Sequence, residues 1–74
     1  MTDNSPVAAL DQLLAEYDEM LTIDDVMRIL NVSRPAVNAR LDASEDPLPS
    51  YRVGKYIRIQ KTDLRDWMLR HRRG

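Results

Sequence analysis

The chain has 74 residues, which is enough for one small domain and near the lower limit at which a single hydrophobic core folds unaided. It contains no cysteine, which excludes a disulfide framework and a thiolate metal site, and its net charge is −1. No apolar run approaches membrane-spanning length, and the first residues lack the basic start of a signal peptide. We therefore expect a cytoplasmic protein.

The charges are unevenly distributed along the chain. Residues 1–27 hold seven of the twelve acidic residues and no lysine or arginine, whereas all eleven basic residues lie in residues 28–74. Charge runs often do no more than solvate a surface. Here the basic residues fall on two motifs described below, so the asymmetry favours a face that binds nucleic acid.

Residues 1–4 are expected to be disordered, and residues 5–20 to form an acidic amphipathic helix that Ser5 and Pro6 begin. Its apolar residues alternate in spacing between three and four, as in a heptad seam. Two interpretations stay open: the helix folds back on its own domain, or it supports self-association. In a third, its acids compete with nucleic acid for the basic face. The apolar residues are Val7, Leu10, Leu14 and Tyr17, with Leu21 continuing the spacing.

Residues 21–41 have the pattern of two short helices joined by a tight turn, a helix-turn-helix. Thr22 and Asp25 have the spacing of a capping box, and Asn31 tolerates the left-handed backbone at a helix end. Ser33 caps the second helix, in which Val37 points inward. This predicts a recognition helix with polar residues facing base edges in the major groove: Ser33, Arg34, Pro35, Asn38 and Arg40.

Residues 42–50 form a connector with two prolines, after which two β-prone runs flank the turn residues Gly54 and Lys55. This pattern predicts a hairpin wing whose cations lie along the minor groove or the DNA backbone: Arg52, Lys55 and Arg58. The face of Arg52 stays open, and the alternative is an ordinary exposed hairpin. Tyr51 and Tyr56 are expected to pack the wing on the core.

The last predicted helix is capped by Thr62 and supplies core residues, Trp67 among them. The basic tail, residues 70–74, has three interpretations: cations that favour a helix C-terminus, phosphate contacts, or a strip that docks another protein. Its cations are Arg70, Arg72 and Arg73, and His71 is expected to be an exposed tail residue.

Three segments occur in an order that resembles the excisionases of phages and mobile elements: LTIDDVMRILNVSR, LPSYRVGKYIRI and TDLRDWM. The resemblance covers residues 21–69, and a mycobacteriophage excisionase is the narrower hypothesis. It implies a mainly α fold with a small β-hairpin wing, a MerR-like winged helix-turn-helix, here preceded by the extra N-terminal helix. Proteins of this family are recombination directionality factors that bind and bend attachment-site DNA in the bacterial host cell and direct a tyrosine integrase towards excision.

Within this interpretation Arg34 and Asn38 are the base contacts, because arginine suits guanine and asparagine suits adenine. Arg28, Arg40 and Lys61 are phosphate candidates that set the register on double-stranded DNA. We expect no enzyme, no cofactor and no metal, because the chain lacks a glycine-rich phosphate loop and any cluster of residues with catalytic or metal-ligand spacing.

Other functions remain possible for the same pattern. A small phage transcription regulator of this fold would bind an operator, often as a symmetric dimer. A protein-interaction adaptor would use the acidic helix and bind no DNA, and a DNA-packaging protein is a further alternative. The fold alone does not distinguish these functions.

Overall fold

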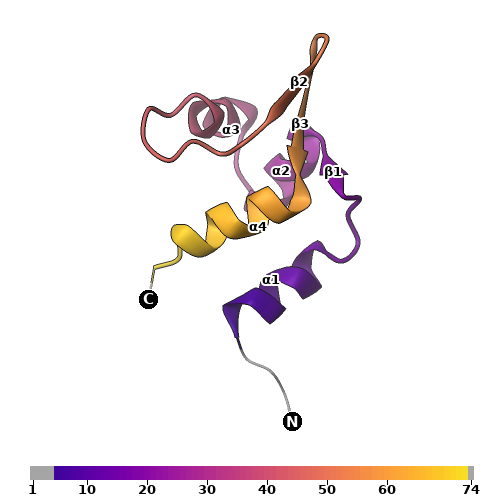
Figure 1. Ribbon diagram of the computed structural model, residues 1–74, viewed down its shortest axis with the longest axis vertical. Helices are drawn as coiled ribbons and strands as arrows, with labels where there is room; N and C mark the ends of the chain where they lie inside the picture. Colours follow the sequence, from indigo (N-terminus) through magenta and orange to yellow (C-terminus); the bar gives the residue numbers. More distant parts are fainter. Residues whose placement is uncertain (1–4, 74) are drawn as a thin grey trace.

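The computed structural model describes residues 5–73, which form four helices and three short strands (Figure 1). The expectation of disorder at residues 1–4 concerns residues outside this range. In chain order the elements are α1 (Pro6–Leu14), β1 (Met20–Leu21), α2 (Ile23–Leu30), α3 (Arg34–Leu41), β2 (Tyr51–Val53), β3 (Tyr56–Gln60) and α4 (Lys61–Arg70).

The helix-turn-helix forms where the local signals place it. Thr22 Oγ1 accepts a hydrogen bond from the Asp25 backbone N–H, and the Asp25 carboxylate accepts one from the Thr22 N–H, both at 3.0 Å. This capping box starts α2, and Asn31 ends it in the left-handed conformation, with φ 56° and ψ 50°. Ser33 then caps α3. The predicted helix-turn-helix is therefore confirmed in its caps and its turn.

The predicted hairpin is present as β2 and β3, and it belongs to a three-stranded antiparallel sheet in the order β1-β3-β2. Gly54 turns the hairpin with a φ of +62°, which a glycine adopts without steric cost. The two-residue strand β1 was not predicted; it pairs Leu21 with Ile59 and so joins the base of the wing to the segment that precedes α2.

One small core holds these elements together. Its buried residues come from every helix, from β1 and β3 and from the connector: Leu14, Leu21, Val26, Val37, Leu48, Ile59, Leu64 and Trp67. Four helices and a small antiparallel sheet around this core make a mainly helical winged helix-turn-helix, as the sequence predicts.

The N-terminal helix differs from the prediction of one helix over residues 5–20. Helix α1 ends at Leu14, because Leu14 enters the core and Leu21 is needed as a strand residue opposite Ile59. Tyr17 also packs against the core. Leu14 and Tyr17 are therefore used within the domain, which is the fold-back interpretation, while Val7 is 44% exposed and self-association through α1 stays a prediction.

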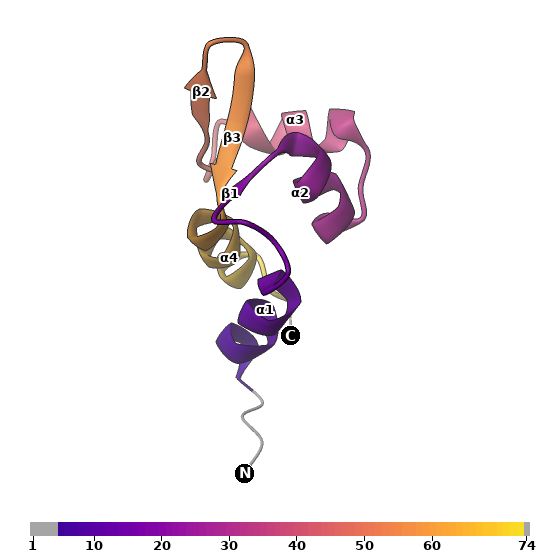
Figure 2. The same cartoon turned by 90° about the vertical axis from the view of Figure 1, so that its right-hand side faces the viewer.

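The molecule is elongated, 45 × 25 × 18 Å, and α1 lies at the opposite end of its long axis from the wing (Figures 1 and 2). Helix α1 packs against α4, which lies between α1 and the wing. Helix α1 itself holds one acidic residue, Asp11, which pairs with Arg65 of α4, and Glu19 in the segment after α1 lies near Lys61. These pairs involve no cation of the wing, which argues against the interpretation in which the N-terminal acids compete with nucleic acid for the basic face.

The connector is fastened to α4 by Asp46. Its backbone oxygen accepts a hydrogen bond from Trp67 Nε1 at 3.1 Å, and its carboxylate pairs with Arg70 and His71. Asp46 has a positive φ of 45°, which aspartate tolerates better than most residues. The predicted cap of α4 is wrong: the helix begins at Lys61, directly after β3, and Gln60 at the capping position makes no side-chain capping bond.

Candidate nucleic-acid interface

The start of α3 presents polar side chains to solvent. Ser33 Oγ accepts a hydrogen bond from the Ala36 N–H at 3.4 Å, which makes Arg34 the first helical residue. Asn38 lies one turn further along and on the same side as Arg34, because residues four apart are neighbours on a helix surface. Arg34, Pro35 and Asn38 are all exposed, while Val37 is fully buried. The geometry suits a helix that enters the major groove with this end and this side.

Arg40 does not share that surface. Successive helical residues are rotated by about 100°, so Arg40 lies about 200° from Asn38, on nearly the opposite side of α3. There it lines an apolar groove with Leu30 and Trp67. The structure therefore separates Arg40 from the other predicted recognition residues, and we leave it out of the base-contacting set.

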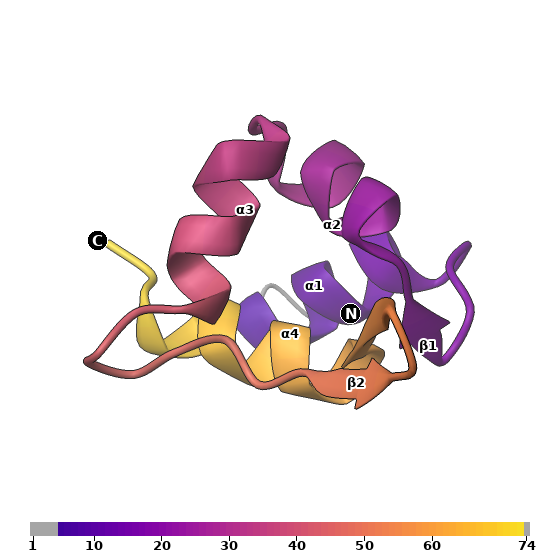
Figure 3. The same ribbon diagram turned by 90° about the horizontal axis from the view of Figure 1, so that it is seen from above.

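A cleft of about 280 Å³ joins the start of α3 to the wing. Arg34 reaches it from α3, and Lys55 and Arg58 reach it from the hairpin, so three predicted DNA-contacting cations converge on one surface. Figure 3 looks onto this end of the molecule, where α2, α3 and the hairpin lie in front of α1. The remaining lining residues are Thr22, Ile23, Asp24, Tyr56 and Ile57.

The wing carries its cations on both sides of the hairpin. Arg58 donates a hydrogen bond through Nη1 to the Ile57 carbonyl oxygen at 2.9 Å, and its guanidinium lies 5.3 Å from the centre of the Tyr56 ring. Lys55 Nζ lies 5.5 Å from the same ring. Arg52 is opposite Ile57 in the strand register, which places it on the other side of the hairpin from Arg58.

The two tyrosines of the wing are exposed to solvent, contrary to the prediction. Tyr51 and Tyr56 are 51% and 53% exposed, so the prediction that they pack the wing on the core is wrong. They alternate with Ile57 and Ile59, which take the inward positions, and this register turns the tyrosines outward. The Tyr56 ring instead lies beside two cations of the wing, Lys55 at its tip and Arg58 within β3.

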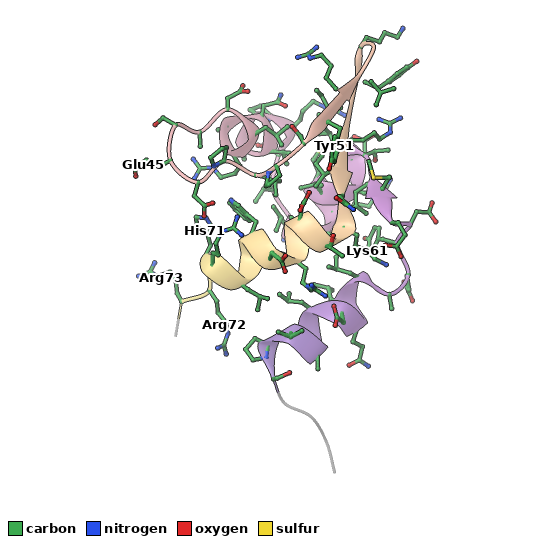
Figure 4. All side chains as sticks on the ribbon, viewed as in Figure 1. Glu45, Tyr51, Lys61, His71, Arg72 and Arg73 are labelled. Carbon is green, nitrogen blue, oxygen red and sulfur yellow. The ribbon has the colours of Figure 1, made fainter. Side chains whose placement is uncertain are left out.

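The two outlying phosphate candidates differ in their surroundings. Arg28, in the last turn of α2, is exposed and lies 3.5 Å from Asp25. Lys61 has a different role from the one predicted: its ammonium group donates hydrogen bonds to the carbonyl oxygens of Leu14 and Tyr17, and its side chain is only 19% exposed. Figure 4 shows Lys61 at the start of α4, away from the wing tip. We therefore leave Lys61 out of the interface.

The tail cations lie at the far end of α4 from the wing (Figure 4). Arg70 is still part of α4, and its guanidinium holds the pKa of Asp46 below the usual value through a hydrogen bond, against a smaller opposing effect of desolvation. His71 is exposed, as predicted, and it pairs with Asp46 and lies against Trp67 with 4.2 Å between ring centres. Arg72 and Arg73 are exposed.

The cleft contains one acidic residue, Asp24, that was not predicted from the sequence. Asp24 accepts a hydrogen bond from Arg34 at 2.5 Å, although ten residues separate them. Its position in the first turn of α2 is explained equally well by the helix dipole, so no local pattern distinguishes it.

Among residues 5–73, no group of three or more histidine, aspartate and glutamate side chains is placed to hold a metal ion. Within the same range, no helix is both long and apolar enough to cross a membrane.

Comparison with known proteins identifies the domain. Residues 20–72, well over half of the chain, match the family model of a helix-turn-helix domain. No curated protein and no solved structure matches the chain. The matched residues contain α2, α3, the wing and α4, and the helix-turn-helix indicates binding to double-stranded DNA. The protein therefore belongs to the helix-turn-helix domain family, which includes excisionase-like DNA-binding proteins.

Proposed function

We propose that the protein is a sequence-specific architectural DNA-binding protein that binds and bends attachment-site DNA and directs a tyrosine integrase towards prophage excision. The observation that carries the DNA-binding part is the cleft in which Arg34 of α3 meets Lys55 and Arg58 of the wing. Cations from a recognition helix and from a hairpin that share one surface suit two adjacent grooves of one duplex.

In the proposed complex, α3 enters the major groove with its N-terminal turn. Arg34 donates to guanine and Asn38 makes a bidentate contact with adenine, the pairings that groove geometry favours. Lys55 and Arg58 hold the wing against the neighbouring minor groove or backbone, with Arg52 on the other side of the hairpin. Arg28 contacts a phosphate from the end of α2. The matching of a helix and a wing to two grooves at once favours a bent duplex.

The size of the domain supports assembly of several copies on DNA. A single module of this kind buries about 600 to 1,000 Å² of its surface on DNA, which limits its affinity. Cooperative binding of neighbouring copies to repeated sites supplies the additional affinity. Because α1 and the exposed tail cations Arg72 and Arg73 lie at the other end of the long axis from the wing, they stay available for a neighbouring copy or an integrase.

The excisionase role is supported by the resemblance of three sequence segments to phage excisionases, while the order of the helix-turn-helix, wing and closing helix is shared with transcription regulators of the same fold. The test is a gel-shift titration of the protein against fragments of its source genome, with random competitor DNA, at two salt concentrations. We expect a ladder of discrete complexes, weakened by salt, on a fragment beside an integrase gene. A single complex at a promoter would instead indicate a transcription regulator, and no retained fragment at either salt would overturn DNA binding.

A further inference from the structure

We propose that Asp24 is a positioning residue that sets the base preference of Arg34. The inference rests on the proposed function, because it concerns the residue that we place in the major groove. It goes further by assigning a role to a carboxylate in a surface that otherwise gathers cations.

The contact is direct and joins the two helices of the helix-turn-helix. Arg34 Nη2 donates a hydrogen bond to Asp24 Oδ1 at 2.5 Å, from the first residue of α3 to the first turn of α2. Both residues line the cleft between α3 and the wing. The guanidinium is therefore held at the place where α3 and the hairpin converge.

Fold stability gives a poor explanation for this pair. The Arg34 and Asp24 side chains are 51% and 60% exposed, and ion pairs this exposed contribute little to folding. Asp24 is not needed as the helix cap either, because the neighbouring residue Asp25 completes the capping box with Thr22. The hydrogen bond does favour one direction of the Arg34 side chain, toward Asp24 and the cleft.

The chemistry of the guanidinium allows Asp24 and a base to bind together. A guanidinium has five N–H donors in one plane, and the contact with Asp24 is made through Nη2 alone. The remaining donors are free to meet the O6 and N7 acceptors of guanine. An arginine already held in its binding direction loses less conformational freedom when it binds, and this lowers the cost of that one contact.

The negative charge of Asp24 also makes the contact selective. A carboxylate beside the guanidinium repels phosphate groups, so Arg34 is kept from the sequence-independent contact that an unrestrained arginine makes with the backbone. Asp24 thus weakens binding to DNA of any sequence and strengthens the preference for guanine at one position. Removal of Asp24 should therefore strengthen binding to random DNA and weaken the preference for guanine. A purely electrostatic effect of Asp24 would instead change the affinity for all sequences alike.

The experiment is selection from a library of randomised duplexes, followed by binding titrations on the selected site and on a single-base mismatch. The proteins are the wild type, Asp24→Asn, Arg34→Ala and the double variant. Asp18→Asn is the matched control, because it removes the same charge at an exposed position between α1 and β1. Circular dichroism and thermal unfolding confirm that each variant is folded.

We expect Asp24→Asn to reduce the preference about twofold to fivefold at the single position that Arg34→Ala also affects, the range of an exposed ion pair, while affinity for random DNA stays equal or rises. In the Arg34→Ala background the Asp24 change should leave the base preference unaltered. The Asp18→Asn control should keep the wild-type preference.

The proposal would be overturned if Asp24→Asn kept the full base preference of the wild type. This includes tighter binding with every base preference intact, because Asp24 would then act only through its charge. An equal loss of base preference at all positions of the site would overturn it as well. A wild-type protein that selects no motif would contradict the proposed sequence-specific function itself, which is a different result from any of these.

Discussion

Lys61 Nζ donates a hydrogen bond to the carbonyl oxygen of Tyr17 at 2.9 Å, across 44 residues of sequence. The same ammonium group bonds the Leu14 carbonyl oxygen at 3.2 Å, at the C-terminal end of α1. The last carbonyl groups of a helix have no partner within the helix and carry its negative partial charge. Lys61 therefore joins the start of α4 to the end of α1.

Lys61→Met should destabilise the domain because it keeps the aliphatic stem but removes both hydrogen bonds. We expect a loss of about 1.5 to 3 kcal/mol in the free energy of unfolding, the range for hydrogen bonds to a charged group. Denaturant unfolding measures it, and DNA affinity of the folded variant should stay unchanged. A Lys61→Met protein that is as stable as the wild type but binds DNA more weakly would instead indicate that Lys61 contacts a DNA phosphate.

Arg34→Ala should reduce discrimination between the preferred site and a single-base mismatch by about 1 to 3 kcal/mol, since it removes a bidentate base contact. Competition titrations with the two duplexes measure the difference. Arg40→Ala is the matched control, because it changes the same residue type on the other side of α3, in the groove with Trp67. Equal losses in the two variants would contradict the orientation proposed for α3.

Lys55→Ala should weaken binding to all sequences alike, because a cation at the tip of the wing contacts phosphates. Each phosphate contact contributes about 0.9 to the slope of log affinity against log salt, so the slope should fall by about that amount. Arg73→Ala on a single-site duplex is the control, since it removes one charge at the end remote from the wing. If the slope of log affinity against log salt is unchanged in Lys55→Ala, the tip of the wing does not contact DNA phosphates.

The contribution of Asp46 to stability should depend on pH. Its pKa is lowered from the usual 3.8, chiefly by the hydrogen bond from Arg70, so the unfolded chain takes up this proton at a higher pH than the folded protein. The stabilisation is therefore complete above pH 3.8 and is lost as the pH falls through the lower pKa of the folded state. Asp46→Asn is the test variant, because asparagine tolerates the same positive φ.

Free energies of unfolding measured from pH 6 to pH 2 should show the wild type more stable than Asp46→Asn at pH 6. The gap should close progressively below pH 3.8. A gap of constant size over the whole range would mean that the charge of Asp46 does not fasten the connector to α4.

The features that the sequence predicted are those with local causes. The capping box of Thr22 and Asp25, the left-handed Asn31 and the turn at Gly54 each depend on residues within one turn of the chain. Contacts between distant residues left no such pattern. The bonds from Lys61 to the end of α1 and to Tyr17 are long-range, and so is the pairing of the two-residue strand β1 with β3.

The same distinction applies to the candidate site. The sequence identified the cations and the element on which each lies, because helix caps and strand alternation are readable from neighbours. The separation of Arg40 from Asn38 follows from helix rotation and could have been predicted, whereas the groove that Arg40 shares with Leu30 and Trp67 depends on packing between distant elements. The sequence could not reveal the contact between Asp24 and Arg34 either, which only the packing of α2 against α3 creates.

Binding of DNA through α3 and the wing is tested most directly by an NMR titration of the labelled protein with a duplex that carries its selected site. The largest amide shifts should occur at residues 33–38 and 52–58, with small changes in α1 and at residues 70–73. Shifts concentrated in α1 and the end of α4, with the start of α3 and the wing unaffected, would contradict this mode of binding.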